Sequence, residues 1–329
     1  MSMDKPPFNS DSLKIELEKT KQEREPIIEG FLYKDSTLMI AGDTGSGKSV
    51  INTEAIACLS CASPLFKALN ISKPRISYYI LFERTKDEIL ERLKKVRSVI
   101  PFDCVNIFID DQLVGKNVLK ESDSTAIIKR IQNYCPTPDV IFLDPIYACV
   151  SGGLSTDEGA SAFCRFSTML QKTFSCSLWL THHTHRPKYM KNGDKLEEDD
   201  PFYGSVWLKA HLTASYHLKR QGQNSVMLDC KKDSQSNLLS KMLLHFDHET
   251  YTCQMDDTHN PMKSLDRLAM FIRACKRQNR KFNIEEMTKE IGVSRGNFFV
   301  LLQTPLIAGS LAVSKAKYGK NLYEVAKDI

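Results

Sequence analysis

Residues 42–49 read Gly42-Asp43-Thr44-Gly45-Ser46-Gly47-Lys48-Ser49, which is a complete G-x-x-x-x-G-K-S/T phosphate loop. The loop follows an apolar run at residues 38–41 and precedes a predicted helix at residues 50–59. Glycines let backbone N–H groups curl around a polyphosphate, and a helix that starts there points its positive end at the same anion. The pattern therefore predicts a nucleotide site. The alternative is a Gly/Ser-rich surface turn.

Two side chains of this loop have chemistry suited to a nucleotide. We expect Lys48 to reach the β- and γ-phosphates, and the Ser49 hydroxyl to bind Mg²⁺. The predicted cofactors are therefore ATP and Mg²⁺. The residues expected to bind the nucleotide are Gly42, Asp43, Thr44, Gly45, Ser46, Gly47, Lys48, Ser49 and Val50.

The composition indicates a globular protein with room for about two domains, since 42% of the 329 residues are hydrophobic. No stretch approaches the ~20 apolar residues of a membrane span, and the N-terminus has no apolar signal region. Ten cysteines are scattered along the chain, and Cys58 and Cys61 alone have C-x-x-C spacing. We interpret this pair as small buried residues, the alternative being a metal or redox site. These features favour a reduced, cytoplasmic protein without a membrane partner.

Strand-like and helix-like segments alternate along most of the chain, which is typical of an α/β fold with a mostly parallel twisted sheet covered on both faces. The expected strands are residues 37–41, 76–82, 105–109, 140–143, 177–181, 214–218, 225–230 and 242–247. The expected helices are residues 50–59, 85–98, 123–134 and 159–173. The last strands have shorter links, so we expect them to form an antiparallel extension. We divide the chain into a polar segment at 1–30 with a short helical candidate at 12–24, an α/β domain at 31–258, and a C-terminal module at 262–329.

Two acidic residues follow predicted strands near the phosphate loop. Asp144 ends the apolar strand at residues 140–143, where a carboxylate can hold Mg²⁺ through water. Glu83 ends the strand at residues 76–82, where a carboxylate can polarise the water that attacks the γ-phosphate. The alternatives are a strand-ending turn Asp and a surface Glu paired with Arg84 or Lys86.

A strand that runs into several histidines, residues 179–185, is a further candidate. A polar residue at the end of this strand can contact the γ-phosphate and relay its presence to the next loop. The other interpretations are a metal site, which lacks a Cys or carboxylate at ligand spacing, and plain loop histidines.

Together, these features resemble the RecA-type hexameric ATPases over about residues 29–249, and most closely the plasmid replicative helicase branch (RepA-like). The resemblance rests on the phosphate loop, Glu83, the Leu-Asp-Pro sequence at 143–145 and the Thr-His-His-Thr sequence at 181–184. It implies a RecA-like P-loop core in which Glu83 is the catalytic acid and Asp144 the magnesium-side acid. His182 or His183 would be the γ-phosphate sensor, and chain order favours His183.

The resemblance also implies DNA contacts and a contact between subunits. Loops at residues 151–157 and 184–203 would line a central channel that holds single-stranded DNA. The second loop offers Arg186, Lys188 and Lys191 for phosphate contacts, although its acidic run at 197–200 does not suit that role. A basic finger reaching the neighbouring subunit's site would come from Lys231 or Lys232. The family more often has an arginine nearby, and the alternative is a surface lysine pair.

The C-terminal module is basic, with 13 Lys and Arg against six Asp and Glu from residue 262 to 329. An apolar stripe predicts a helix at 264–278, and two short helices at 283–291 and 294–302 form a helix-turn-helix pattern. A hairpin with strands at 311–314 and 321–325 follows, so the module resembles a winged helix. The residues expected to contact DNA are Arg295, Asn297, Lys315, Lys317 and Lys320. The alternative is a module for protein contacts or ring assembly.

The function predicted from the sequence is that of an ATP-driven, ring-forming DNA motor, a replicative helicase of a plasmid, phage or similar element. We expect a homo-oligomer, a hexamer by the resemblance, with single-stranded DNA in its channel and possible duplex binding by the winged helix. One alternative is an ATP-gated DNA-binding regulator or recruitment factor that does not unwind DNA. A second alternative is a RecA-like recombination or repair ATPase.

Overall fold

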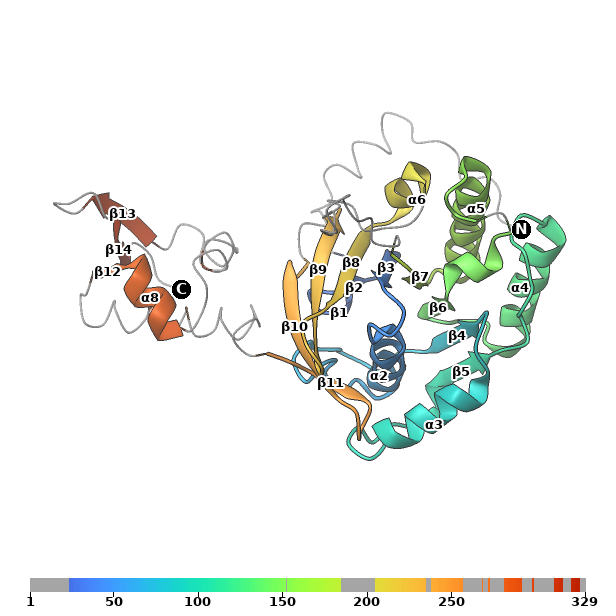
Figure 1. The fold of residues 1–329 in the computed structure, drawn as a ribbon, viewed down its shortest axis with the longest axis horizontal. Helices are drawn as coiled ribbons and strands as arrows, with labels where there is room; N and C mark the ends of the chain where they lie inside the picture. The colour runs from blue at the N-terminus through green and yellow to red at the C-terminus, as the bar shows by residue number, and fades with distance from the viewer. Residues whose placement is uncertain are drawn as a thin grey trace, which may run out of the picture.

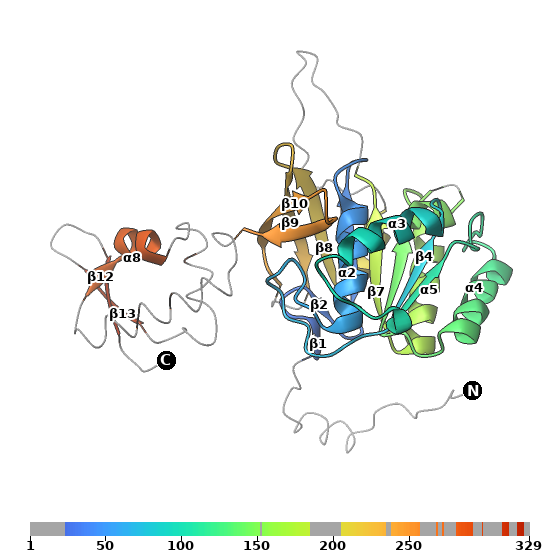
Figure 2. The same cartoon turned by 90° about the horizontal axis from the view of Figure 1, so that it is seen from below.

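The computed structural model describes residues 24–151, 153–184, 205–234 and 238–256, and in the C-terminal module residues 268, 272, 281–291, 298, 311–315 and 321–325. The helix predicted at residues 12–24 lies outside these ranges, apart from Arg24. The described residues form a nine-stranded sheet with helices on both faces, together with a two-stranded and a three-stranded sheet (Figures 1 and 2).

The nine-stranded sheet is mostly parallel, with the order β11-β10-β9-β8-β3-β7-β6-β4-β5. Neighbouring strands from β8 to β5 run parallel, whereas β8, β9, β10 and β11 pair antiparallel. The strands are β3 (Thr37–Gly42), β4 (Ser77–Leu81), β5 (Ile107–Asp110), β6 (Val140–Asp144), β7 (Ser177–His182), β8 (Ala214–Arg220), β9 (Ser225–Asp233), β10 (Lys241–Asp247) and β11 (Thr252–Met255). The predicted parallel sheet and its antiparallel extension are confirmed.

Helices cover both faces of the sheet, and the central strands are therefore buried on both sides. Helices α2 (Lys48–Cys61) and α3 (Lys86–Val96) lie on one face, and α4 (Glu121–Tyr134), α5 (Asp157–Phe174) and α6 (Val206–His211) lie on the other (Figure 1). Successive residues of a strand point to opposite faces. Tyr79 therefore packs in the layer of α2 and α3, whereas Tyr78 packs in the layer of α4 and α5.

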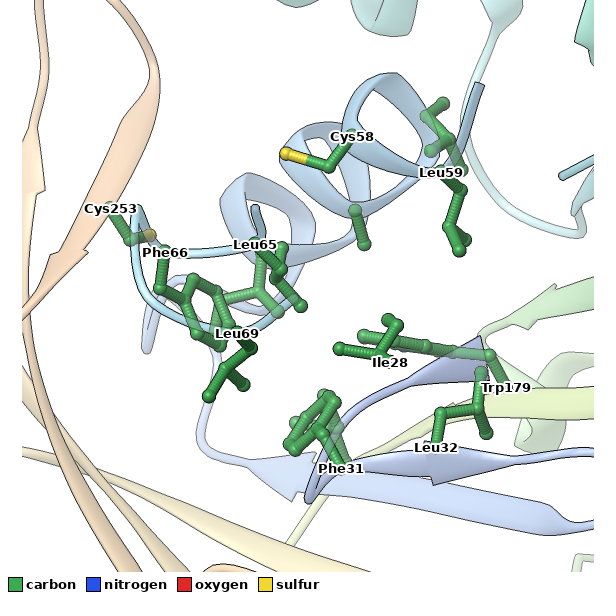
Figure 3. Packing of buried hydrophobic residues seen from close by; sticks show 14 of the residues in the cluster. Ile28, Phe31, Leu32, Cys58, Leu59, Leu65, Phe66, Leu69, Trp179 and Cys253 are labelled. Atoms are coloured by element: carbon green, nitrogen blue, oxygen red, sulfur yellow. The ribbon is translucent and has the colours of Figure 1, made fainter. Parts of the chain in front are cut away.

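A short hairpin closes the core layer beneath α2. Strands β1 (Pro26–Ile28) and β2 (Leu32–Tyr33) place Phe31 against Trp179 of β7, with ring centroids 5.4 Å apart (Figure 3). Cys58 of α2 belongs to the same apolar cluster, and burial raises the pKa of its thiol well above the ordinary value. The cysteines within the described ranges are free thiols. Cys58 thus has the surroundings of a packing residue.

The predicted strands and helices of the α/β domain are confirmed, with ends that shift by at most three residues. The start of the strand predicted at 105–109 is instead the 3₁₀ turn η1 (Cys104–Asn106). Strands β1, β2 and β11 and helix α6 were not predicted, because such short elements contain too few residues to show a period. The hairpin of β1 and β2 also shows that Ile27 and Ile28, inside the segment expected to be polar, are buried.

The described part of the C-terminal module contains β12 (Phe282–Asn283), α8 (Ile284–Ile291), β13 (Leu311–Lys315) and β14 (Asn321–Val325). These strands form an antiparallel sheet with the order β12-β14-β13. The predicted hairpin is therefore confirmed. Most residues of the two helices predicted at 264–278 and 294–302 lie outside the described residues. Among the helices that the structure describes, none is both long and apolar enough to cross a membrane.

Candidate active site

The phosphate loop lies at the edge of the sheet where the central parallel strands end. The register of the sheet pairs Ala41 of β3 with His182 of β7, and Leu81 of β4 with Asp144 of β6. Side chains at and just beyond these four strand ends therefore meet at one edge, which is where ligands bind in open parallel sheets.

Glycine is required at one position of the loop for two separate reasons. Gly47 caps α2 with φ at 101°, a left-handed conformation in which a residue with a Cβ is strained. A Cβ at this position would also lie 2.2 Å from Cζ of Phe246 in β10. The loop therefore turns sharply into α2 and leaves its backbone N–H groups at the start of the helix, where anions bind.

Lys48 is held across the mouth of the loop by backbone carbonyls. Its Nζ donates to the carbonyl oxygens of Gly42 at 2.6 Å and Asp43 at 2.8 Å. Burial lowers the pKa of Lys48 to about 8, against the opposing effects of Asp144 and Asp43. A bound polyphosphate would favour the ammonium form and raise this pKa again.

This difference in pKa predicts a pH dependence of ATP binding. The pKa in the nucleotide-free protein is about 8, so above that pH the ammonium must be restored when ATP binds. We expect the affinity for ATP to fall by about fivefold between pH 8 and pH 9, measured by equilibrium titration, with an uptake of protons that calorimetry in different buffers detects. In the Lys48→Arg variant the guanidinium stays charged, so any remaining affinity should not decline. A wild-type affinity that is constant across this range would contradict the prediction.

The side chains predicted from separate strands line one cavity of about 250 Å³ together with the phosphate loop. Glu83 from the end of β4, Asp144 from β6 and His183 from the end of β7 all line it, beside residues 44–50. Their convergence is the geometry that the sequence predicted for a nucleotide site.

Asp144 is the centre of a buried polar network beneath the cavity. Its Oδ2 accepts hydrogen bonds from the Tyr79 hydroxyl at 2.5 Å and from Asn52 Nδ2 at 3.1 Å. Asn52, on α2, also donates to Thr181 Oγ1 at 2.8 Å and accepts from Trp179 Nε1 at 2.9 Å. Burial raises the pKa of Asp144, and the hydrogen bonds from Tyr79 and Asn52 oppose that shift. The network fixes the carboxylate relative to α2, β4 and β7, so it is not a flexible turn residue.

Glu83 is exposed and lines the cavity, with the Tyr147 hydroxyl near it. Burial and a hydrogen bond to Glu83 raise the pKa of the Tyr147 hydroxyl above its ordinary value. The neighbouring Arg84 instead pairs with Glu88 at 2.7 Å. In the described part of the chain, Glu83 forms an ion pair with neither Arg84 nor Lys86, so the alternative interpretation of a paired surface glutamate is not what the structure shows.

The two candidate sensor histidines have different positions. His182 is the last residue of β7 and is fully buried, whereas His183 lines the cavity, 5.0 Å from the Tyr147 ring between centroids. Burial and then the nearby Lys48 lower the pKa of His183. The next residue, Thr184, donates a hydrogen bond from Oγ1 to the Asp43 carboxylate of the phosphate loop. The geometry favours His183 over His182 as the residue that contacts a γ-phosphate.

The two candidate finger lysines are engaged within their own subunit. Lys232 Nζ donates to the carbonyl oxygens of Lys209 at 2.7 Å and Ala210 at 2.9 Å, near the end of α6. Lys231 pairs with Asp229 at 2.9 Å. Neither lysine lines the cavity of its own chain. The structure thus places Lys232 as a cap on α6, a contact that was not predicted because α6 itself was not.

Most of the residues predicted to contact DNA lie outside the described ranges. These are Arg186, Lys188, Lys191, Arg295, Asn297, Lys317 and Lys320. Lys315 is described as the last residue of β13.

Seven residues that line the cavity were not among the predicted site residues. They are Arg84, Arg92, Pro145, Arg220, Phe246, His248 and Tyr251. Arg220 ends β8, the strand next to β3, so the rule that located Glu83 and Asp144 could have located it too. The three aromatic side chains come from the end of β10 and the turn that follows, and the phosphate loop lies about 200 residues earlier. No local signal connects the two segments.

The residues at this edge fit a nucleotide with Mg²⁺. The hydroxyl of Ser49 and the carboxylate of Asp144 line the same cavity as the phosphate loop, and hard oxygen ligands of this kind suit Mg²⁺. Within the described ranges, no cluster of three or more His, Cys, Asp or Glu side chains could hold a metal by itself. A metal bound partly by phosphate oxygens fits this donor set.

The family model of the AAA domain (AAA_25) matches residues 5–188, a stretch that includes the phosphate loop, Glu83, Asp144 and His183. The chain belongs to this family. It is therefore a P-loop ATPase, and it has a large, mostly parallel sheet. Among solved structures, the chain is similar to a KaiC-like protein from the hyperthermophilic archaeon Pyrococcus horikoshii OT3, with 12% identity and a TM-score of 0.48 over 70% of this chain and 93% of that chain. The search of curated proteins gave no match.

Proposed function

We propose that this ATPase is a ring-forming DNA motor and that it acts as a replicative helicase of a plasmid, phage or similar mobile element. One observation carries the proposal: a single cavity gathers the phosphate loop, Glu83, Asp144 and His183. A motor of this type needs a phosphate site, an acid to activate water and a side chain that senses the γ-phosphate. All three are available at one edge of the sheet.

The proposed hydrolysis assigns a separate task to each side chain. Lys48 and the loop N–H groups hold the phosphates, and the Glu83 carboxylate takes a proton from the attacking water. Ser49 and Asp144 would hold Mg²⁺, which neutralises phosphate charge when bound. Burial lowers the pKa of His183 in the nucleotide-free site, which favours the neutral imidazole there, and this imidazole can hydrogen-bond an incoming γ-phosphate.

The contact between Thr184 and Asp43 supports a coupling of hydrolysis to movement. Thr184 is the first residue of the predicted channel loop, and its hydroxyl bonds to the phosphate loop itself. A γ-phosphate bound by His183 would therefore affect the position of the neighbouring Thr184, which leads directly into that loop. Release of the phosphate would change the position of the loop and of the DNA strand that it holds.

The C-terminal module supports the proposal that DNA is the partner. Its sheet order β12-β14-β13, with α8 between β12 and β13 along the chain, agrees with a winged-helix arrangement. The module also has an excess of seven positive charges between residues 262 and 329, and a basic surface favours an anionic partner. We propose that Lys315, Lys317 and Lys320 of the wing contact DNA phosphates.

A second candidate is an ATP-gated DNA-binding regulator that uses the same core as a switch. The contacts of Lys231 and Lys232 within their own subunit favour it, because a finger from the neighbour accelerates hydrolysis by ~10³–10⁵ in related phosphoryl transfers. Without such a finger, the core would hydrolyse ATP slowly and act mainly through its ATP-bound state.

An unwinding assay on a forked DNA duplex separates the two candidates. For the motor, we expect ATP-dependent strand separation by the full chain, and none by the Lys48→Ala variant. Duplex binding that ATP modulates without strand separation would favour the switch, and joint-molecule formation would favour a recombination ATPase. A chain that remains monomeric with DNA and an ATP analogue, and that hydrolyses no ATP, would refute both the motor and the recombination ATPase.

A further inference from the structure

Three arginines line the nucleotide cavity, and the proposed hydrolysis gives none of them a task. They are Arg84, which directly follows Glu83, Arg92 on α3 and Arg220 at the end of β8. A cation at the transferred phosphate accelerates phosphoryl transfer by ~10³–10⁵, whether it comes from the same chain or from a partner. The candidate finger lysines are bound within their own subunit. A cation from the same chain is therefore the alternative source.

Arg92 and Arg220 are held mainly by uncharged groups. The Arg92 guanidinium lies 5.5 Å from the centroid of the Tyr251 ring, and its side chain is only 17% exposed. Arg220 Nη2 donates to the carbonyl oxygen of Gln223 at 3.3 Å. A bound phosphate resembles neither of these partners, so it would not take the place of either one.

The Arg84 guanidinium is instead held by a carboxylate. Its Nη1 lies 2.7 Å from Oε2 of Glu88, in the first turn of α3, and the Arg92 guanidinium lies 3.8 Å from the same oxygen. Helix α3 lies beside α2, the helix that begins at Lys48 (Figures 1 and 2). The side chains of Arg84 and Glu88 are 42% and 47% exposed, and exposed ion pairs contribute little to stability. A triphosphate with several negative charges can therefore replace Glu88 as the partner of Arg84.

The charge of Arg84 acts at the phosphate end of the cavity. Burial is the main cause of the lowered pKa of Lys48, and the nearby Arg84 guanidinium adds to it. Burial likewise raises the pKa of Asp144, and Arg84 is one of the groups that oppose this shift. Arg84 therefore lies close enough to influence both the lysine of the phosphate loop and the acid on the magnesium side.

We propose that Arg84 is the cation that the same chain supplies to the γ-phosphate, and that Glu88 is its positioning residue. Without nucleotide, Glu88 holds the guanidinium against α3. When ATP binds, the γ-phosphate takes the place of Glu88, and the guanidinium neutralises charge that develops during hydrolysis. The ion pair with Glu88 is then a brake on ATP binding, because it must be broken first. This inference rests on the proposed ATPase function and adds the source of its cation.

Replacement of Arg84 tests the first part of the inference. We expect Arg84→Ala to lower turnover at saturating ATP by about 10³-fold. The binding of a non-hydrolysable ATP analogue should change much less, because the cation acts mainly in the transition state. Arg84→Lys keeps a positive charge without the planar fork of the guanidinium, so it should hydrolyse ATP at an intermediate rate.

Replacement of Glu88 tests the second part. We expect Glu88→Gln to bind the analogue about two- to fivefold more tightly than the wild type does, the range that release of one exposed ion pair permits. The binding of ADP, which has no γ-phosphate, should not change. The gain should vanish when Arg84→Ala is also present, because Glu88 acts through Arg84. Calorimetric titration measures all of these affinities.

Glu91→Gln is the matched control, because Glu91 pairs with Lys94 on the same helix and is 70% exposed. Its replacement should leave the affinity for the analogue unchanged. If Glu88 had a merely structural role, Glu88→Gln would have a lower melting temperature and would not bind the analogue more tightly.

Either of two results would overturn the inference. One is turnover by Arg84→Ala within about threefold of the wild-type rate. The other is a gain from Glu88→Gln that is absent, or that persists unchanged when Arg84→Ala is also present. Failure of the proposed function has a different signature, since the wild-type protein would then hydrolyse no ATP, or Lys48→Ala would hydrolyse it as fast as the wild type does.

Discussion

Replacement of Glu83 by glutamine is expected to slow ATP turnover by about 10²–10⁴-fold, because the amide cannot accept a proton from water in the transition state. The glutamine has the same shape and can still accept a hydrogen bond from Tyr147. Since the carbonyl oxygens of Gly42 and Asp43, and not Glu83, hold the Lys48 ammonium, we expect ATP to bind with nearly wild-type affinity. Phosphate release at saturating ATP measures the first effect, and equilibrium titration measures the second.

Glu91→Gln is a suitable control for this experiment. Glu91 lies on α3, where it pairs with Lys94 and is 70% exposed. Its replacement should leave both turnover and binding unchanged. If Glu83→Gln hydrolysed ATP within about threefold of the wild-type rate, Glu83 would not be the general base, and the role would pass to another group of the cavity.

The positions of the two acids could be predicted from the sequence, because a simple rule connects them. Parallel strands end at the same edge of a sheet, so an acid at the end of an apolar run is a candidate for the phosphate-loop site. The rule fails for Asp110, because β5 is the edge strand of the sheet and Asp110 lies outside the cavity. The rule needs no long-range information beyond the identification of strands. It worked for Glu83 and Asp144, and it would also have worked for Arg220 at the end of β8.

The choice between His182 and His183 could not be made in the same way. Alternation of polar and apolar residues identifies which side chains of a half-buried strand point away from the core. This signal is absent in β7, because all six of its residues are buried. Moreover, β7 extends one residue beyond the predicted end, to His182. His183 is therefore the first residue outside the strand, and it is the one that lines the cavity.

Contacts between distant segments account for the rest of what the sequence did not predict. In the sequence, Asn52 is an ordinary residue of a predicted helix. Its hydrogen bonds with Asp144, Thr181 and Trp179 become apparent only when β6 and β7 are placed beside α2. The contact of Phe246 with Gly47 likewise depends on the antiparallel extension, which brings β10 to the phosphate loop. Such contacts follow from strand order, and a single sequence does not give strand order.

Asp144 allows catalysis and stability to be separated by two substitutions at one position. We expect Asp144→Asn to raise the Mg²⁺ concentration required for half-maximal turnover by about 10–100-fold, because the carboxylate that holds the metal is lost. The amide oxygen can still accept the hydrogen bonds from Tyr79 and Asn52. Since burial raises the pKa of Asp144 above its unfolded value, the ionised carboxylate lowers stability at neutral pH. The asparagine variant should therefore be at least as stable as the wild type.

Asp144→Ala should show the same rise in the required Mg²⁺ concentration and a loss of stability as well. It leaves the buried Tyr79 hydroxyl without the carboxylate that accepts its hydrogen, at a cost of about 1–3 kcal/mol. Asp110→Asn is the matched control, because Asp110 is a buried carboxylate that accepts from the Tyr78 hydroxyl at 2.7 Å and pairs with Arg130, outside the cavity. That variant should lose stability without a change in Mg²⁺ requirement. An unchanged Mg²⁺ requirement in Asp144→Asn would instead restrict Asp144 to the buried network, and the metal would then depend on Ser49 and the phosphates alone.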